Sequence, residues 1–135
     1  PRGTLILKRR REQKVNGLIY LTTALLVLTK LLDVLSTLGR ITHPDIETNP
    51  LARPVMQKIG VKAASWLVFA VAVAIIACSG FAALYGPFFY QVLFILLGIA
   101  ISVIQAAVAL NNHTGRTNPI TSQIFRLHQA LQRRL

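Results

Sequence analysis

The chain has 135 residues, enough for one domain, and 53% of them are hydrophobic while only 14% are charged. Lysine and arginine outnumber aspartate and glutamate by 15 to 4, and the resulting net charge of +11 is typical of proteins that bind nucleic acid or an anionic membrane surface. Residues 63–115 contain no charged side chain, although the helices of a soluble domain need a polar face. The pattern therefore argues against a soluble nucleic-acid-binding protein and a disordered basic tail, and it indicates a membrane protein.

The first third of the chain combines a basic tail with a first span. Residues 1–16 are predicted to be a basic N-terminal tail that includes Arg9, Arg10 and Arg11. A membrane span is predicted over residues 17–38, which are apolar except near Lys30 and Asp33. A polar connection follows over residues 39–61, and its three prolines break any long helix.

Two further spans fill the uncharged region. They are predicted over residues 63–85 and 88–110, each of a length that crosses the hydrocarbon core of a bilayer. Gly86 and Pro87 join them in a tight turn. The aromatic residues around this turn are typical of a membrane–water interface; they are Tyr85, Phe88, Phe89 and Tyr90.

The C-terminal tail, residues 113–135, carries isoleucine and leucine at helical spacing with arginines between them. This spacing predicts a basic amphipathic helix that lies on the membrane surface or on a partner. The predicted fold class is therefore an all-α integral membrane protein with three transmembrane helices plus a C-terminal amphipathic surface helix. Its parts are the basic tail 1–16, the membrane domain 17–112 and the basic tail 113–135.

Three spans place the N-terminus and the Gly86–Pro87 turn on one side of the membrane, and residues 39–62 with the C-terminal tail on the other. The first side carries 6 Lys and Arg residues and the second carries 8, so this count does not distinguish the two possible orientations in the membrane. The arginines next to the first span favour a cytoplasmic N-terminus. The expected location is a bacterial inner (cytoplasmic) or intracytoplasmic membrane.

Lys30 and Asp33 lie three residues apart and so share one face of the first span, which Thr37 continues. Charged groups in a membrane are costly unless they are paired or face protein. The favoured interpretation is an internal ion pair that allows the span to insert. The alternative is a functional carboxylate that binds a proton or a cation.

Small residues recur every four residues in the second and third spans, and such stripes let helix backbones approach closely. We expect them to pack the last two spans against each other or against the first. The stripes are Gly98, Ser102 and Ala106 in the third span, and Ala70, Ala74, Cys78 and Ala82 in the second. In the third span Gln91, Gly98, Gln105 and Asn112 are also spaced seven residues apart. A path for a substrate, lined by Gln91, Ser102 and Gln105, is the alternative.

The polar connection contains His43, Asp45 and Glu47 in alternation, a weak pattern for a metal site. The sequence contains no serine-hydrolase, zinc-protease, nucleotide-binding or Cys-x-x-Cys motif. We therefore predict no catalytic residues, no metal and no cofactor.

The stretch from Asp33 to Leu51 resembles an uncharacterised family of small prokaryotic integral membrane proteins. The resemblance rests on Asp33-x-x-x-Thr37 at the end of the first span and on Glu47-Thr-Asn49-Pro50 after it. It implies that these side chains form one polar site at a membrane face. Asn112, at the end of the third span, is expected on the same side, and a hydrogen-bonded cap over the helix ends would explain the set. The predicted cluster is Asp33, Thr37, Glu47, Asn49 and Asn112.

The predicted function is that of a non-catalytic accessory or stabilising subunit of a larger membrane complex, with photosynthetic and respiratory complexes as candidates. Its partners would be other membrane subunits and anionic lipids, with no nucleic acid and no small-molecule substrate. The residues expected to contact lipid or partners are Arg9, Arg10, Arg11, Arg126, Arg133 and Arg134. Two alternatives stay open: a small oligomeric ion-coupled transporter that uses Asp33, and a membrane-embedded metal-dependent enzyme that uses Asp33, His43, Asp45 and Glu47.

Overall fold

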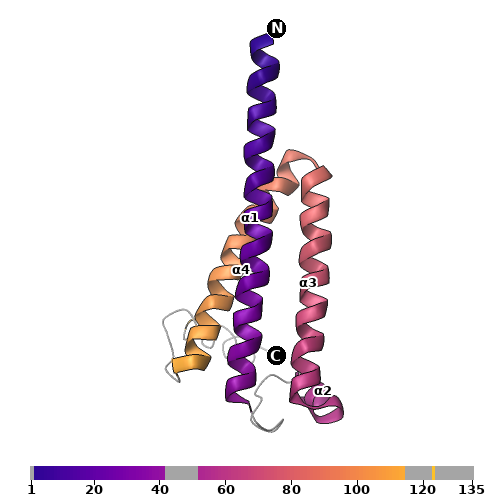
Figure 1. Ribbon diagram of the computed structural model, residues 1–135, viewed down its shortest axis with the longest axis vertical. Helices are drawn as coiled ribbons and strands as arrows, with labels where there is room; N and C mark the ends of the chain where they lie inside the picture. Colours follow the sequence, from indigo (N-terminus) through magenta and orange to yellow (C-terminus); the bar gives the residue numbers. More distant parts are fainter. Residues whose placement is uncertain (1, 42–51, 115–122, 124–135) are drawn as a thin grey trace, which may run out of the picture.

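The computed structural model describes residues 2–41, 52–114 and 123 of the chain. These residues form four α-helices: α1 (Arg2–Arg40), α2 (Ala52–Ile59), α3 (Val61–Tyr85) and α4 (Phe88–Thr114) (Figure 1). Three segments are long and apolar enough to cross a membrane, namely Arg9–Arg40, Val61–Tyr85 and Phe88–Thr114. The prediction of an all-α protein with three candidate spans is therefore confirmed. The predicted C-terminal surface helix lies outside the described residues.

Helix α1 is longer than the predicted first span. The residues expected to form a separate tail continue the helix without a break, from Arg2 through Gly17 to Arg40. Lys, Arg, Glu, Gln and Leu are good helix formers, and the described part of this segment contains no proline. At 39 residues α1 is about 58 Å long, roughly twice the hydrocarbon thickness of a bilayer. Its N-terminal part therefore projects beyond the hairpin of α3 and α4 (Figure 1).

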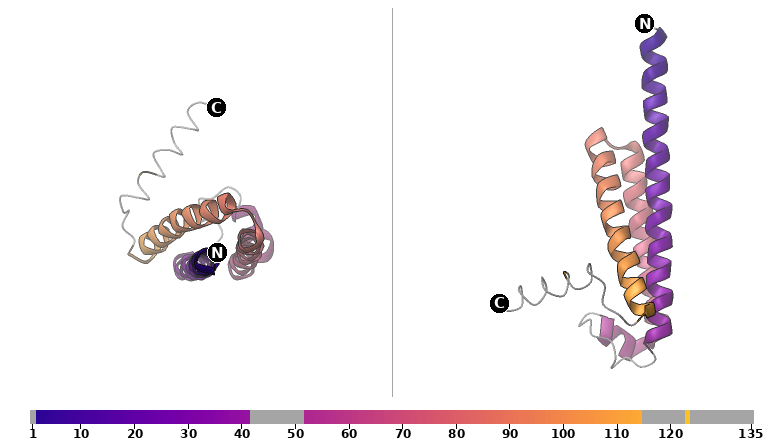
Figure 2. Two further views of the ribbon diagram at one scale, coloured as in Figure 1. Left: turned by 90° about the horizontal axis from the view of Figure 1, so that it is seen from above. Right: turned by 90° about the vertical axis from the view of Figure 1, so that its left-hand side faces the viewer.

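Helix α1 packs against both α3 and α4. The latter two meet at the Gly86–Pro87 turn, as predicted, and then separate towards the opposite end of the bundle (Figures 1 and 2). The described N-terminal residues and this turn lie towards the same end, whereas α2 lies at the other end, next to the start of α3 (Figures 1 and 2). Two arrangements are expected for the last two spans, packing on each other or packing on the first span. The structure shows mainly the second, since α3 and α4 each pack on α1.

Two glycines allow α1 to approach its neighbours closely. A Cβ atom at Gly98 of α4 would overlap the Cγ2 methyl group of Thr22, and it would stand 3.2 Å from Cδ1 of Leu26. A Cβ atom at Gly80 of α3 would stand 2.9 Å from Oγ1 of Thr23. Because apolar surfaces in lipid gain little from mere contact, such close approach is a main source of helix association in membranes.

Helix α2 replaces part of the predicted polar connection. Pro54 lies in its first turn, where a missing backbone N–H costs no hydrogen bond. Met56 is buried against Ile41 and Ala64, and this small apolar cluster joins the end of α1 to the start of α3. Gly60 links α2 to α3 with a φ of +84° and a ψ of 157°, a conformation that is essentially confined to glycine.

Replacement of Gly98 by alanine tests the contact between α1 and α4. We expect Gly98→Ala to lower the free energy of unfolding in detergent by about 1–3 kcal/mol, because the new methyl group overlaps Thr22. Thr22→Ser removes that methyl group of Thr22, so Gly98→Ala should cost clearly less in a Thr22→Ser background.

Gly17→Ala is the matched control, because no side chain or neighbouring helix lies within 4 Å of the position of its Cβ atom. Thermal unfolding of the purified variants measures the effect. Equal stability of Gly98→Ala and Gly17→Ala would contradict the proposed close contact.

Candidate functional site

A polar seam runs along the interface between α1 and α4. The Thr29 hydroxyl, whose residue is buried, lies 2.8 Å from Oε1 of Gln105 and donates to it; it also lies 2.9 Å from the backbone oxygen of Leu25. Thr29 and Gln105 come from different helices and are 76 residues apart. A hydrogen bond between side chains inside an apolar bundle fixes how two helices are rotated and aligned.

The seam ends in a cluster at the α2 end of the bundle. Nη1 of Arg40 donates to Oδ1 of Asn112 at 2.8 Å. Nδ2 of Asn112 donates to the hydroxyl groups of Ser36 and Thr37, at 3.4 and 3.5 Å. One amide of α4 thus binds three side chains in the last turns of α1, and it keeps the two helix ends together.

Lys30 and Asp33 form an ion pair on α1. Nζ of Lys30 lies 2.7 Å from Oδ2 of Asp33, and the two side chains are 16% and 18% exposed. Asp33 also accepts a hydrogen bond from Ser36 through its backbone oxygen. Both residues lie on the same face of α1 as Leu26, at spacings of four and seven residues. The ammonium group of Lys30 thus neutralises the carboxylate of Asp33 within the same helix. This favours a structural ion pair over a site at which Asp33 binds a proton or a cation.

The structure brings together part of the predicted polar cluster. Asn112 donates a hydrogen bond to Thr37, which agrees with the prediction that both lie at the same end of the bundle. Asp33 lies one helical turn before Thr37, and its side chain forms the ion pair with Lys30. Glu47 and Asn49 lie outside the described residues. Ser36 and Thr29 were not predicted as members of the site. Their spacing could have indicated them, because Thr22, Thr29 and Ser36 repeat every seven residues and so match the series Gly98, Gln105 and Asn112 on α4.

The predicted packing stripes are only partly correct. Gly98 and Ser102 are buried between α4 and α1, and Ser102 is 2% exposed. Ala106 is exposed, and Ala107 and Ala109 are buried in its place. Ala70, Ala74 and Cys78 of α3 are also exposed, because the contact through Gly80 turns that stripe away from α1. The buried positions of α3 are Ala64, Ser65, Ile76, Gly80 and Ala83.

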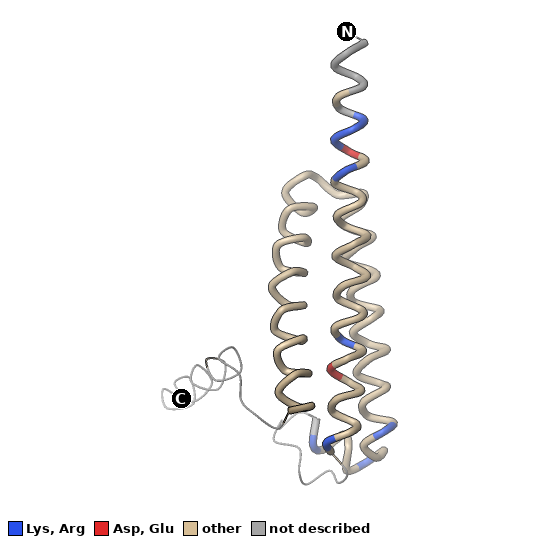
Figure 3. The backbone as a smooth tube through the Cα atoms, turned by 60° about the vertical axis from the view of Figure 1, so that its left-hand side comes forward, with Lys and Arg blue, Asp and Glu red and all other residues tan. Residues whose placement is uncertain are grey.

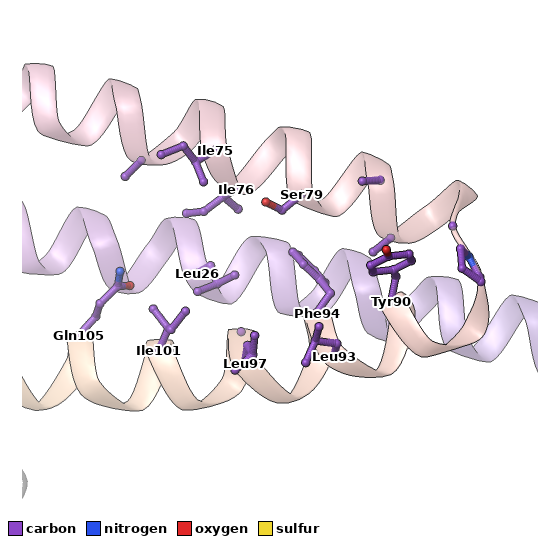
Figure 4. A pocket seen from close by; sticks show the side chains of 16 residues that line it. Leu26, Ile75, Ile76, Ser79, Tyr90, Leu93, Phe94, Leu97, Ile101 and Gln105 are labelled. Carbon is purple, nitrogen blue, oxygen red and sulfur yellow. The ribbon is translucent and has the colours of Figure 1, made fainter.

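A cavity of about 650 Å³ lies between α3 and α4 where the two helices separate (Figure 4). Leu26 of α1 lies at its base, and Ile75, Ile76, Leu97 and Ile101 lie on its walls. The polar side chains on its lining are Ser79, Tyr90 and Gln105. Of the three residues proposed to line a substrate path, only Gln105 reaches this cavity; Ser102 is buried, and Gln91 lies 3.5 Å from the backbone oxygen of Gly86, to which it donates.

Apart from Lys30, the basic residues of the described segments lie towards the two ends of the bundle (Figure 3). Arg9, Arg10, Arg11 and Lys14 are exposed on α1 near the hairpin turn. Arg40, Lys58 and Lys62 are exposed at the other end. The predicted contacts Arg126, Arg133 and Arg134 lie outside the described residues. Exclusion of charge from the middle of the spans is expected for a protein whose helices cross hydrocarbon.

Within residues 2–41 and 52–114, no group of three His, Cys, Asp or Glu side chains is close enough to hold a metal ion. The loop residues His43, Asp45 and Glu47 lie outside these ranges. No known family, curated protein or solved structure matches the chain. The resemblance through Asp33, Thr37 and Asn49 therefore stays a prediction.

Neutralising one member of the ion pair should destabilise the protein. We expect Lys30→Met and Asp33→Asn each to lower the free energy of unfolding in detergent by about 1–3 kcal/mol, because each leaves a mostly buried charge without its partner. The double variant Lys30→Met/Asp33→Asn leaves no charge and should recover most of the loss.

Glu12→Gln on the exposed part of α1 is the control and should be neutral within about 0.5 kcal/mol. Denaturant titration followed by circular dichroism gives these values. An additive loss in the double variant would show that the two charges do not compensate each other.

Asn112→Ala should loosen the end of α1. We expect a loss of about 0.6–1.7 kcal/mol, which lies between the mean and the maximum found for hydrogen bonds between membrane helices. Hydrogen exchange of the backbone amides in the last turn of α1 should become faster. Asn111→Ala removes the same group one position away on α4 and serves as the matched control. Equal exchange rates in both variants would contradict the role given to Asn112.

Proposed function

We propose that this protein is a non-catalytic accessory subunit that packs beside the spans of a larger membrane protein complex. The observation that carries the proposal is the outward face of α3, on which Ala70, Ala74 and Cys78 are exposed at intervals of four residues. Small side chains at this spacing allow a second helix to approach the backbone closely. Lipid gains nothing from such a stripe, whereas small residues are enriched where membrane helices pack on each other.

The use of polar groups supports a structural role. In the described spans, Thr29 and Gln105 bind each other, Asn112 binds the end of α1, and Lys30 binds Asp33. The first two contacts hold α1 to α4, and the ion pair neutralises two charges within α1. Only 17% to 28% of the residues in the most apolar window of each span are buried within the chain, which leaves ample surface for other subunits.

The basic residues supply the second type of contact. Arg9, Arg10 and Arg11 stand on the part of α1 that projects past the hairpin, where they can meet anionic headgroups or an acidic surface of a partner. The C-terminal residues 113–135 would add a basic amphipathic helix at the opposite membrane face. A bacterial inner or intracytoplasmic membrane, which is rich in anionic lipid, would suit this distribution.

Cys78 provides a direct test, because it is the one cysteine of the sequence and it lies on the outward face of α3. A thiol-reactive photocrosslinker attached to Cys78 should form one dominant adduct of defined mass in the membranes of the cells that produce the protein. Mass spectrometry of the adduct identifies the neighbouring subunit.

The matched control carries the crosslinker at position 79 in the variant Cys78→Ala/Ser79→Cys. Ser79 is also exposed and has nearly the same depth, but it lies about 100° around the helix from Cys78, on the side of the cavity between α3 and α4. We expect little or no protein adduct from this position. The same adducts from both positions, or lipid adducts alone from Cys78, would contradict the proposed interface.

A further inference from the structure

The cavity between α3 and α4 is a groove of limited width. Its walls carry exposed aliphatic side chains, among them Ile75, Leu93 and Leu97, and Leu26 of α1 closes its base (Figure 4). Gln105 follows Tyr90 by fifteen positions, so the wall formed by α4 extends about 22 Å along the helix. This length exceeds half the thickness of the hydrocarbon core, about 15 Å, so the groove runs deep into the bilayer.

The volume of the groove identifies the kind of molecule that fits it. Spread over its length, 650 Å³ corresponds to an average cross-section of about 30 Å². An α-helix with side chains is about 10–12 Å wide and needs roughly 80–110 Å². A partner helix of this width could at most lie across the groove, whereas a single hydrocarbon chain fits inside it.

The outer end of the groove lies at a membrane interface. Tyr85, Phe88, Phe89 and Tyr90 are all exposed around the turn, as expected for an interfacial belt. The inner end is bounded by the amide of Gln105, which binds Thr29. The groove is thus apolar over the depth that an acyl chain would occupy.

Positive charge stands just beyond this outer end. The pairs Thr29–Gln105 and Ser36–Asn112 are both separated by 76 residues, and this offset places Lys14 level with Tyr90. Arg9, Arg10 and Arg11 follow about one turn further out, and all four cations are exposed. Figure 3 shows basic residues on α1 close to the turn between α3 and α4 and beyond it. With Glu12 counted, residues 9–14 carry a net charge of +3, which suits an anionic headgroup at the mouth of the groove.

The geometry points to a binding site for one anionic phospholipid, with one acyl chain in the groove between α3 and α4 and its phosphate beside the arginines of α1. The inference rests on the lipid contact proposed above but not on the accessory role, because the site is complete within a single chain. Binding of lipid here would fill the space that the separation of α3 and α4 leaves open.

Native mass spectrometry of the delipidated full chain in detergent tests the site. Phosphatidylglycerol should bind at one molecule per chain, and phosphatidylcholine with the same acyl chains should bind about tenfold more weakly. Arg9→Gln/Arg11→Gln should weaken binding of phosphatidylglycerol by roughly 10- to 30-fold and leave binding of phosphatidylcholine unchanged. Ser79→Phe, which fills the groove, should weaken binding of both lipids at least about tenfold.

Each variant has a matched control. Lys58→Gln/Lys62→Gln removes the same charge from exposed residues at the other end of the bundle, and Cys78→Phe adds the same ring on the outward face of α3. Both controls should bind phosphatidylglycerol like the unaltered chain. Equal losses in the two charge variants would show diffuse attraction, and unchanged binding by Ser79→Phe would show that the groove is not the acyl site. Either result, or equal binding of the two lipids, overturns the inference.

A measurement on the unaltered chain covers the case in which Ser79→Phe fails to fold. Phosphatidylglycerol with a photoreactive acyl chain should label the walls of the groove, above all the peptides that contain Ile75 and Leu97. Labelling spread evenly over the lipid-facing surfaces of α1, α3 and α4 would overturn the inference. The crosslink from Cys78 tests the accessory role separately, since it requires another subunit and this measurement does not.

Discussion

The arrangement of this protein depends on one seam between α1 and α4. Three pairs with the same 76-residue offset lie along it: Thr22 against Gly98, Thr29 against Gln105, and Ser36 against Asn112. In hydrocarbon, apolar surface gains little from leaving the lipid, so association depends on close backbone approach and on hydrogen bonds between side chains. The contact of Thr22 with Gly98 provides the close approach of the two backbones, and the other two pairs provide the hydrogen bonds.

The other features of the bundle follow from this seam. Thr23, next to Thr22, meets Gly80 of α3, so neighbouring residues of α1 contact two different helices. Since α1 holds α3 and α4 on separate sides, the two can touch near their turn and must diverge below it. The groove lies where the two helices diverge. The ion pair of Lys30 and Asp33 lies on the same face of α1 as Leu26, which lines the groove.

Much of the fold could be predicted, because the length of each apolar segment and the Gly86–Pro87 turn are properties of the local sequence. The helical continuation of α1 before Gly17 was missed, since a basic segment outside the membrane can be helix or coil and its hydropathy does not distinguish them. The cluster was predicted as far as Thr37 and Asn112, which share a membrane face. Ser36 and Arg40 joined it only because α1 is rotated towards α4 in one particular way.

Composition and spacing were enough to predict three helices long and apolar enough to cross a membrane, charge kept largely outside their apolar parts, and a seven-residue polar repeat on the third of them. They could not show which helix this repeat meets, or that the stripe with Ala70 and Ala74 would point outwards. A repeat marks one face of a helix, and in a membrane every apolar face is already solvated by lipid. The partner of each face is therefore chosen by steric fit and hydrogen bonding between helices far apart in the chain, and these arise only when the helices pack.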